Sequence, residues 1–501
     1  MADIGIFFHG LHGRGFASWL VAVVATLAAF PTVTHAGTRP NVLFIFADDL
    51  GSRDLSCYGS TFYETPRIDK LASQGISYSN AYAAHPRCVP SRASLMTGMF
   101  PAALGCPGGK AWNGGLDPSY TTIGESLKAG GYATGYIGKW HLGGEGMLPS
   151  DQGFDVSIAA GEAGSPRSYF APYDGPFPND QKWRERNKAP IGLTAKSDDE
   201  YLTDRLTDEA IGFIERHEQE APEQPFFLLL AHYAVHQPID AKAEPTARYQ
   251  AKLDAMGPYD GPEFLPRDGV TKARQDDAAY AAMVESVDES VGRLMSTLER
   301  LGIADDTIVI LSSDHGGLSN KGADSRRDVE TSNLPYRAGK GHVYEGGTHV
   351  PLIIRWPGVT RPGSESHDLT VSTDLFPTLL ELTGSPIPQN QHLDGVSIAG
   401  TLRGEPLEDR PPVFWHSPRA RPNSTGDHNA SAVRVGDWKL IQFLDTGEVE
   451  LYHLGVDPFE TTNLAQADPD RAAAMLAMLD DWRARIEATP PKANGKEDPN
   501  D

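Results

Sequence analysis

The sequence predicts an α/β fold with a large, mixed but mostly parallel central sheet flanked by helices, followed by a smaller C-terminal antiparallel-sheet subdomain. Three observations predict it. Continuous apolar runs of strand length alternate with amphipathic helical segments, as in parallel sheets buried on both faces. The chain has 501 residues, more than one ordinary core accommodates. Past about residue 400 the pattern changes to short alternating strands.

Composition limits the functions that the chain can have. The apolar fraction of 40% and the aromatic fraction of 9% are typical of a folded globular protein. The formal net charge of -23 argues against non-specific nucleic-acid binding, so we expect no nucleic-acid partner. If the substrate is an anion, cationic groups must be concentrated at its site.

The first 36 residues have the pattern of a secretory signal peptide. Arg14 precedes an apolar run over residues 19–30, and Thr34 and Ala36 are small residues at the cleavage-determining positions. The run is too short for a comfortable membrane span, although a retained anchor is the alternative. We expect an exported protein, periplasmic or secreted, with no membrane span after cleavage.

The first strand of the mature chain is expected over residues 41–47 and runs directly into Asp48 and Asp49. Adjacent carboxylates at the end of a buried strand are costly unless a cation binds them. Parallel sheets also place ligands at the carboxyl ends of their strands. A solvated acidic turn is the alternative, but the apolar run favours a site for a hard cation such as Ca2+ or Mg2+.

A helix over residues 65–75 and a strand over 76–82 are expected next, leading to Cys88-Val89-Pro90-Ser91-Arg92. The following residues predict a short helix closed by Gly98. Cys88 then lies at or just before a helix N-terminus, where an anion is favoured. The alternative interpretation is a small buried apolar side chain.

Polar residues also follow later predicted strands. A capping box at Thr122–Glu125 opens a helix ending at 130–131. Strands are expected at 132–138, 226–231, 307–311 and 349–356, and helices at 200–217, 274–301 and 371–383. The residues after the first three of these strands are Lys139 and His141, then His232 and His236, then Asp314 and His315.

The run from Cys88 to Gly98, CVPSRASLMTG, resembles the modification signature of the formylglycine-dependent sulfatases, in which this cysteine is oxidised to an aldehyde that hydrates to a geminal diol. Three further stretches are similar to that family in the same order: GKWHLG from Gly138, His236-Gln237-Pro238, and KGHVYEGG from Lys340. The resemblance implies an alkaline phosphatase-like fold. It also implies a catalytic domain over residues 37–400 and a C-terminal α+β subdomain over 401–488, with a helix at 469–487.

The resemblance also implies roles for individual residues. Arg92, Lys139 and Lys340 bind the sulfate, His236 helped by Lys340 protonates the leaving alcohol, and His141 deprotonates the second hydroxyl of the diol. The implied catalytic residues are Cys88, Arg92, Lys139, His141, His236, Lys340 and Asp314. The implied ligands of Ca2+ or Mg2+ are Asp48, Asp49, Cys88, Asp314 and His315. Many relatives carry Asn at the position of His315, and imidazole is softer than a hard cation prefers.

The implied activity is hydrolysis of a sulfate ester, and maturation requires a formylglycine-generating enzyme as partner. The signal peptide favours a sulfated carbohydrate over an aryl sulfate. Two alternatives are a phosphonate monoester or phosphodiester hydrolase of the same superfamily and a non-catalytic sulfated-glycan-binding protein. Residues at motif edges that we expect to affect specificity are Trp112, Asn113, Arg337 and His342.

Several features stay open at this level. For Arg167 and Tyr169, in the loop-rich stretch 145–200, a surface position is the simpler interpretation than substrate contact. Cys57 and Cys106 either pair or remain thiols. We expect the tail over residues 489–501 to be disordered.

Overall fold

The computed structural model describes residues 39–107, 112, 114–173 and 193–491. The predicted signal peptide, Asn113 and most of the predicted disordered tail lie outside these residues. Thr38–Asp501 form one compact unit, so the predicted boundary at residue 400 falls inside it and stays a prediction. Within the described ranges, no helix has the length and apolar character needed to cross a bilayer.

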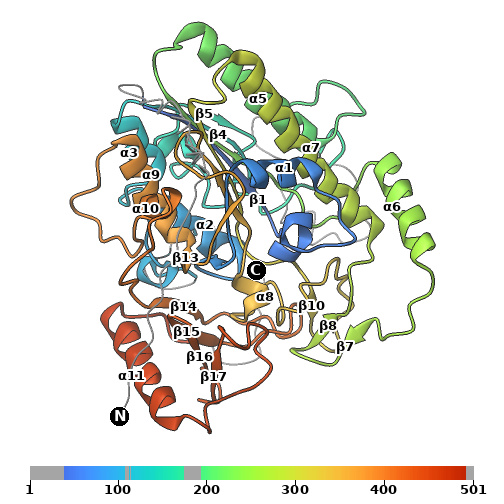
Figure 1. The fold of residues 1–501 in the computed structure, drawn as a ribbon, viewed down its shortest axis with the longest axis vertical. Helices are drawn as coiled ribbons and strands as arrows, with labels where there is room; N and C mark the ends of the chain where they lie inside the picture. The colour runs from blue at the N-terminus through green and yellow to red at the C-terminus, as the bar shows by residue number, and fades with distance from the viewer. Residues whose placement is uncertain (1–38, 108–111, 113, 174–192, 492–501) are drawn as a thin grey trace, which may run out of the picture. The chain divides into compact units, whose positions relative to one another are not determined.

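A central eight-stranded sheet carries the fold (Figure 1). β1 lies between β9 and β6 and is parallel to both, whereas β11 is antiparallel to its neighbours β9 and β2. The predicted mixed, mostly parallel sheet is therefore confirmed. Its strands in spatial order are β12 (Ser364–Ser366), β2 (Ile76–Tyr78), β11 (Leu352–Arg355), β9 (Thr307–Ser313), β1 (Asn41–Ala47), β6 (Phe226–Ala231), β4 (Ala133–Gly138) and β5 (Val156–Ile158).

Helices cover both faces of this sheet (Figure 1). Successive residues of β1 enter different cores: Leu43 and Ile45 pack with one set of helices, and Val42 and Phe44 pack with the other. This two-sided burial explains why the strand is a continuous apolar run. The first set is α1 (Pro66–Gln74), α5 (Leu202–Glu220) and α7 (Ala278–Leu301), and the second is α2 (Cys88–Thr97), α3 (Ile123–Ala129) and α9 (Leu375–Thr383).

The predicted C-terminal antiparallel sheet is confirmed. It has the order β14 (Val413–Ser417), β15 (Ala430–Val435), β16 (Trp438–Phe443), β17 (Val449–His453), and α11 (Pro469–Arg485) packs on it. Tyr82 and Phe100 of the N-terminal part share a core with Trp415 and Trp482, which joins this sheet to the rest of the unit. The remaining described α-helices and strands are α6 (Ala243–Met256), α8 (Glu345–Thr348), α10 (Ala399–Leu402), β3 (Ala81–Tyr82), β7 (Phe264–Leu265), β8 (Val270–Lys272), β10 (Asn320–Lys321) and β13 (Thr370–Val371).

Two predicted elements are corrected by the structure. The single strand expected over residues 76–82 is divided into β2 and β3, because β2 pairs with β11 and β12 in the central sheet whereas β3 pairs with β13 in a separate two-stranded sheet. Between them, the Asn80 side chain donates to the His367 carbonyl oxygen. The helix expected from Val371 begins as a 3-10 turn, Ser372–Asp374, before α9. The other predicted helices and strands are present with ends displaced by a few residues.

Candidate active site

Three carboxylates meet at the carboxyl edge of the central sheet. β1 and β9 are parallel neighbours, so Asp48 and Asp49 after β1 lie beside Asp314 after β9. The backbone N–H of Asp49 donates to Asp314 Oδ1 at 3.1 Å, and all three side chains are buried. Asp48 Oδ1 has no hydrogen-bond partner among the described residues. The structure thus brings the three predicted acidic residues together in one cluster.

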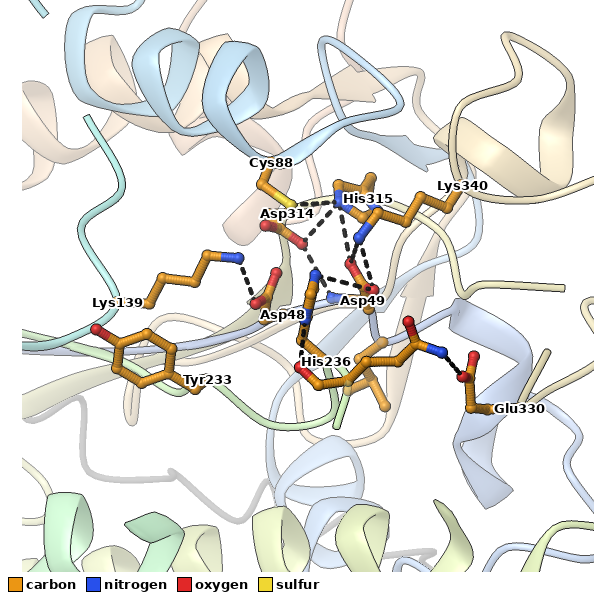
Figure 2. A network of polar contacts seen from close by, with 12 residues as sticks. Asp48, Asp49, Cys88, Lys139, Tyr233, His236, Asp314, His315, Glu330 and Lys340 are labelled. Carbon is orange, nitrogen blue, oxygen red and sulfur yellow. Dashed lines mark hydrogen bonds and ion pairs between the residues drawn. The ribbon is translucent and has the colours of Figure 1, made fainter. Parts of the chain in front are cut away.

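Cys88 faces this cluster from the first residue of α2 (Figure 2). Its Sγ lies 3.2 Å from His315 Nε2, and the same nitrogen lies 3.2 Å from Asp49 Oδ1. One ligand atom from each of Asp48, Cys88, Asp314 and His315 lies within 4.8 Å of the others, a separation suited to a bound cation. The residues present therefore form a possible metal site.

Buried cations compensate the carboxylates. Lys139 Nζ lies 2.5 Å from Asp48 Oδ2, and Lys340 Nζ lies 2.7 Å from Asp49 Oδ1. Arg92 Nε lies 3.0 Å from Asp314 Oδ2. The predicted sulfate-binding cations are thus gathered around the cysteine. Lys139 and Lys340 are each held by one carboxylate, and Arg92 also contacts Asp48 Oδ1, at 3.6 Å.

The charges shift the protonation equilibria of the cluster. Burial raises the pKa of the Cys88 thiol, but the positive charges of Lys139 and Lys340 outweigh it and the net shift is well downward. Burial, with repulsion from Asp314, raises the pKa of Asp48. Burial alone would lower the pKa of His315, but the negative charges of Asp314 and Asp49 outweigh it, so the pKa of His315 is raised. The position of residue 88 therefore favours an anion.

The histidines fall into three environments. His236 lies at the cluster, with Nε2 3.8 Å from Asp49 Oδ2 and Nδ1 2.7 Å from the Gln237 carbonyl oxygen. Burial and the Lys340 charge lower the pKa of His236 to about 3. His141 has φ 59° and stands against Cys88, whose side chain partly offsets the lowering of the pKa of His141 by burial. The imidazole of His232 instead hydrogen-bonds with Ser290 Oγ at 3.0 Å. Of the two histidines that follow β6, His236 is therefore the one that lies at the cluster.

Two of the residues that we expected to affect specificity, Arg337 and His342, have different roles. The Arg337 guanidinium is bound by both oxygens of Asp268 and lies over the Tyr344 ring, 3.8 Å from its centroid. His342 is buried against the Thr425 carbonyl oxygen at 2.9 Å. Both side chains therefore stabilise the structure around the site, because they hydrogen-bond with neighbouring side chains or backbone.

Tyr169 is not a surface residue. It is buried, and its hydroxyl donates to the carbonyl oxygens of Tyr233 at 2.7 Å and His236 at 2.9 Å. Trp112 is half-buried at the edge of a core, and Arg167 is half-buried. Cys57 is an exposed free thiol, so no bond joins it to Cys106.

Sequence reasoning missed a polar group beside His236. Gln237 Nε2 donates to Glu330 Oε1, and Arg327 donates to Gln237 Oε1 at 3.2 Å. Burial raises the pKa of Glu330 to about 8. Figure 2 shows Glu330 on the His236 side of the cluster. Arg327 and Glu330 lie in an irregular stretch between β10 and α8, where no periodic pattern or motif marks a residue.

The order of the sheet and the cluster at its edge place the protein among the alkaline phosphatase-like hydrolases. The family model Sulfatase matches residues 40–385, and the model N-sulphoglucosamine sulphohydrolase, C-terminal, matches residues 338–484. The chain belongs to the sulfatase family and is a sulfuric ester hydrolase.

Known proteins are similar over nearly the whole chain. Human N-acetylgalactosamine-6-sulfatase is 32% identical, over 90% of this chain and 86% of that protein. The structure of Ps i-CgsB in complex with k-i-k-neocarrahexaose has 30% identity and a TM-score of 0.71, covering 89% of this chain and 93% of its own. The phosphonate monoester hydrolase of Agrobacterium radiobacter has 25% identity and a TM-score of 0.60, covering 89% and 96%.

Proposed function

We propose that this sulfatase hydrolyses a sulfate ester on a carbohydrate, with the oxidised side chain of residue 88 as nucleophile and with a bound divalent cation. The observation that carries the proposal is Cys88 at the N-terminus of α2, surrounded by buried Arg92, Lys139 and Lys340. Carbohydrate is favoured because the human relative is named for N-acetylgalactosamine and Ps i-CgsB was solved with an oligosaccharide.

The residues of the cluster fit a hard cation. Asp48, Asp49, Asp314 and His315 would hold Ca2+ or Mg2+. Oδ1 of buried Asp48 accepts no hydrogen bond from the described residues and lies 3.6 Å from the Arg92 guanidinium, so it is available as a ligand atom. The cation would supply positive charge for the ester oxygens and for an anionic nucleophile. Formylglycine at position 88 would supply a hydrated aldehyde whose hydroxyl attacks sulfur.

The chain's own cations bind the sulfate group. Arg92, Lys139 and Lys340 lie against the carboxylates of the cluster, and all three are buried. Figure 2 shows Lys139 and Lys340 on either side of Cys88. In such a low-dielectric site their charges act strongly on the oxygens where negative charge is held in the transition state.

Two histidines and Lys340 move protons in this scheme. His236 has its Nδ1 on a backbone carbonyl and a pKa of about 3, so its Nε2 carries no proton in the free enzyme at neutral pH. We therefore assign the proton for the leaving alcohol to the His236–Lys340 pair, with the Lys340 ammonium as its source. His141, against residue 88, accepts a proton from the side chain there.

Export and maturation belong to the same proposal. The signal-like pattern of residues 1–36 supports a periplasmic or secreted enzyme. The cysteine motif supports a formylglycine-generating enzyme as partner. Nucleic acid is not among the proposed partners.

A second candidate function is phosphonate monoester or phosphodiester hydrolysis, favoured by the likeness to the Agrobacterium radiobacter enzyme. Turnover of sulfate and phosphodiester substrates with the same leaving group distinguishes the two. The third alternative, a non-catalytic protein that binds sulfated glycans, has no support from the family assignment, because the relatives named here are sulfatases.

Release of inorganic sulfate from sulfated oligosaccharides tests the proposal. Protein co-produced with a formylglycine-generating enzyme should release sulfate, lose activity with a chelator and regain it with Ca2+ or Mg2+. Cys88→Ala should abolish turnover, and Cys88→Ser should give at best a slow, trapped enzyme. Multiple turnover by either variant at the wild-type rate would reject the mechanism.

A further inference from the structure

One cation near the cluster has no carboxylate partner. Arg92, Lys139 and Lys340 each form an ion pair, as does Arg87 with Asp427. Arg327 instead donates to two neutral groups, Ser424 Oγ at 2.8 Å and Gln237 Oε1 at 3.2 Å. In the part of the chain that the structure describes, no carboxylate lies within ion-pair distance of its guanidinium.

The surroundings leave the charge of Arg327 under-compensated. Burial lowers the pKa of Arg327, and the nearby acidic groups, Glu330 and Asp49, offset this only in part. Glu330 itself has a pKa of about 8 and is largely protonated at neutral pH. A half-buried guanidinium with two neutral partners retains donors for an anion.

Arg327 also lies where the alcohol part of the substrate must leave. Gln237 directly follows His236, which the proposed function places at the leaving group. Ser424 belongs to the loop whose Asp427 binds Arg87, the residue before Cys88, at 2.8 Å. Arg327 thus bridges the segment on the leaving-group side and the loop that supports the nucleophile.

We propose that Arg327 binds a second anionic group, a sulfate or a carboxylate, on the sugar chain that carries the scissile sulfate. The inference rests on the proposed function. It assigns a substrate class with two anionic groups close together. A planar guanidinium binds either anion through two hydrogen bonds, and such charge-assisted contacts change affinity about 10- to 100-fold.

The test compares wild type, Arg327→Met, Arg327→Lys and the control Arg326→Met, all with residue 88 converted. Arg326 is exposed and adjacent, so its substitution removes the same charge from the surface. The substrates are 4-nitrophenyl sulfate, N-acetylgalactosamine 6-sulfate, its 4,6-disulfate and a 6-sulfated disaccharide with a uronic acid. Melting temperatures establish that each variant folds, and Arg327→Lys carries the test if Arg327→Met does not fold.

Wild type and Arg326→Met should prefer a doubly charged sugar over the monosulfated one, as measured by kcat/KM. Arg327→Met should lose about 10- to 100-fold of that preference, and Arg327→Lys a smaller part. The sugar whose preference is lost identifies sulfate or carboxylate as the anion. An unchanged preference, no preference in wild type, or an equal loss on all four substrates would overturn the inference. Wild type that cleaves only 4-nitrophenyl sulfate would instead contradict the carbohydrate substrate of the proposed function.

Discussion

Buried ion pairs hold the functional side chains in place. Lys139 and Asp48 are both 0% exposed, and removing one member of such a pair leaves an uncompensated charge that costs about 3–5 kcal/mol. The positions of the carboxylates could be predicted from the sequence, because Asp48, Asp49 and Asp314 each follow a strand at one sheet edge. The roles of Arg92 and Lys340 were instead implied by the resemblance to the sulfatase motifs. Arg327 could not be predicted, because its position depends on contacts between three segments far apart in the sequence.

Leaving-group chemistry separates the roles of the site residues. A sugar alkoxide needs a proton to leave, whereas 4-nitrophenolate does not. His236→Gln should therefore lower kcat/KM on a sugar sulfate by about 10²- to 10⁴-fold, and much less on 4-nitrophenyl sulfate. Lys340→Met also removes a sulfate-binding charge, so it should lower both values, and the value on the sugar sulfate more. Arg92→Met, a control at a sulfate-binding position, should lower both values by similar factors. Equal losses on the two substrates for the His236 variant would remove it from the proton-donating pair.

At the scale of elements, α2 connects the nucleophile to the core. It begins at Cys88, ends at Thr97 and is closed by Gly98, which has φ +69°. The motif letters predicted the closing glycine, and they placed Cys88 at or just before the first residue of the helix. The division of residues 76–82 into two strands could not be predicted, because it depends on the pairing of β2 with β12 and of β3 with β13, strands of two different sheets that lie almost 290 residues later in the chain.

Gly98→Ala should destabilise the protein through backbone strain and a clash. A Cβ at this position would lie 3.0 Å from the Phe376 side chain, and the left-handed conformation alone costs about 1–2 kcal/mol. Gly302→Ala is a matched control, since it has φ +77° and no atom within 4 Å of its added Cβ. Urea unfolding should show a larger loss of unfolding free energy for Gly98→Ala. A loss no larger than that of Gly302→Ala would show that Phe376 yields without cost.

At the scale of the whole molecule, a buried charge cluster joins the C-terminal sheet to the motif that carries Lys340. Lys439 Nζ, from β16, lies 2.8 Å from Glu345 Oε1 of α8 and 2.9 Å from Glu460 Oε1. The alternating pattern predicted the C-terminal sheet, but not this connection, because an isolated Lys or Glu in a strand or loop does not reveal its partner. The C-terminal sheet thereby supports the segment that positions Lys340.

This cluster makes stability depend on pH. Burial raises the pKa of Glu460 to about 7 from 4.5, so the folded state holds a proton that the unfolded state releases. The contribution of the protonated Glu460 side chain to the free energy of unfolding is therefore fully present below pH 4.5 and is lost as the pH rises through about 7. Glu460→Gln should therefore flatten the fall in unfolding free energy across this window, measured by urea unfolding at several pH values. Glu448→Gln, on the exposed surface, should leave the slope unchanged, and an unchanged slope in Glu460→Gln would contradict the assignment.

The central claim is that residue 88 acts as formylglycine within this cluster. The most direct measurement is the mass of the proteolytic peptide that contains residue 88, from protein co-produced with a formylglycine-generating enzyme and active in sulfate release. The fraction of residue 88 converted from thiol to aldehyde should rise in proportion to the rate of sulfate release. Full sulfatase activity with an unmodified Cys88 thiol would contradict it.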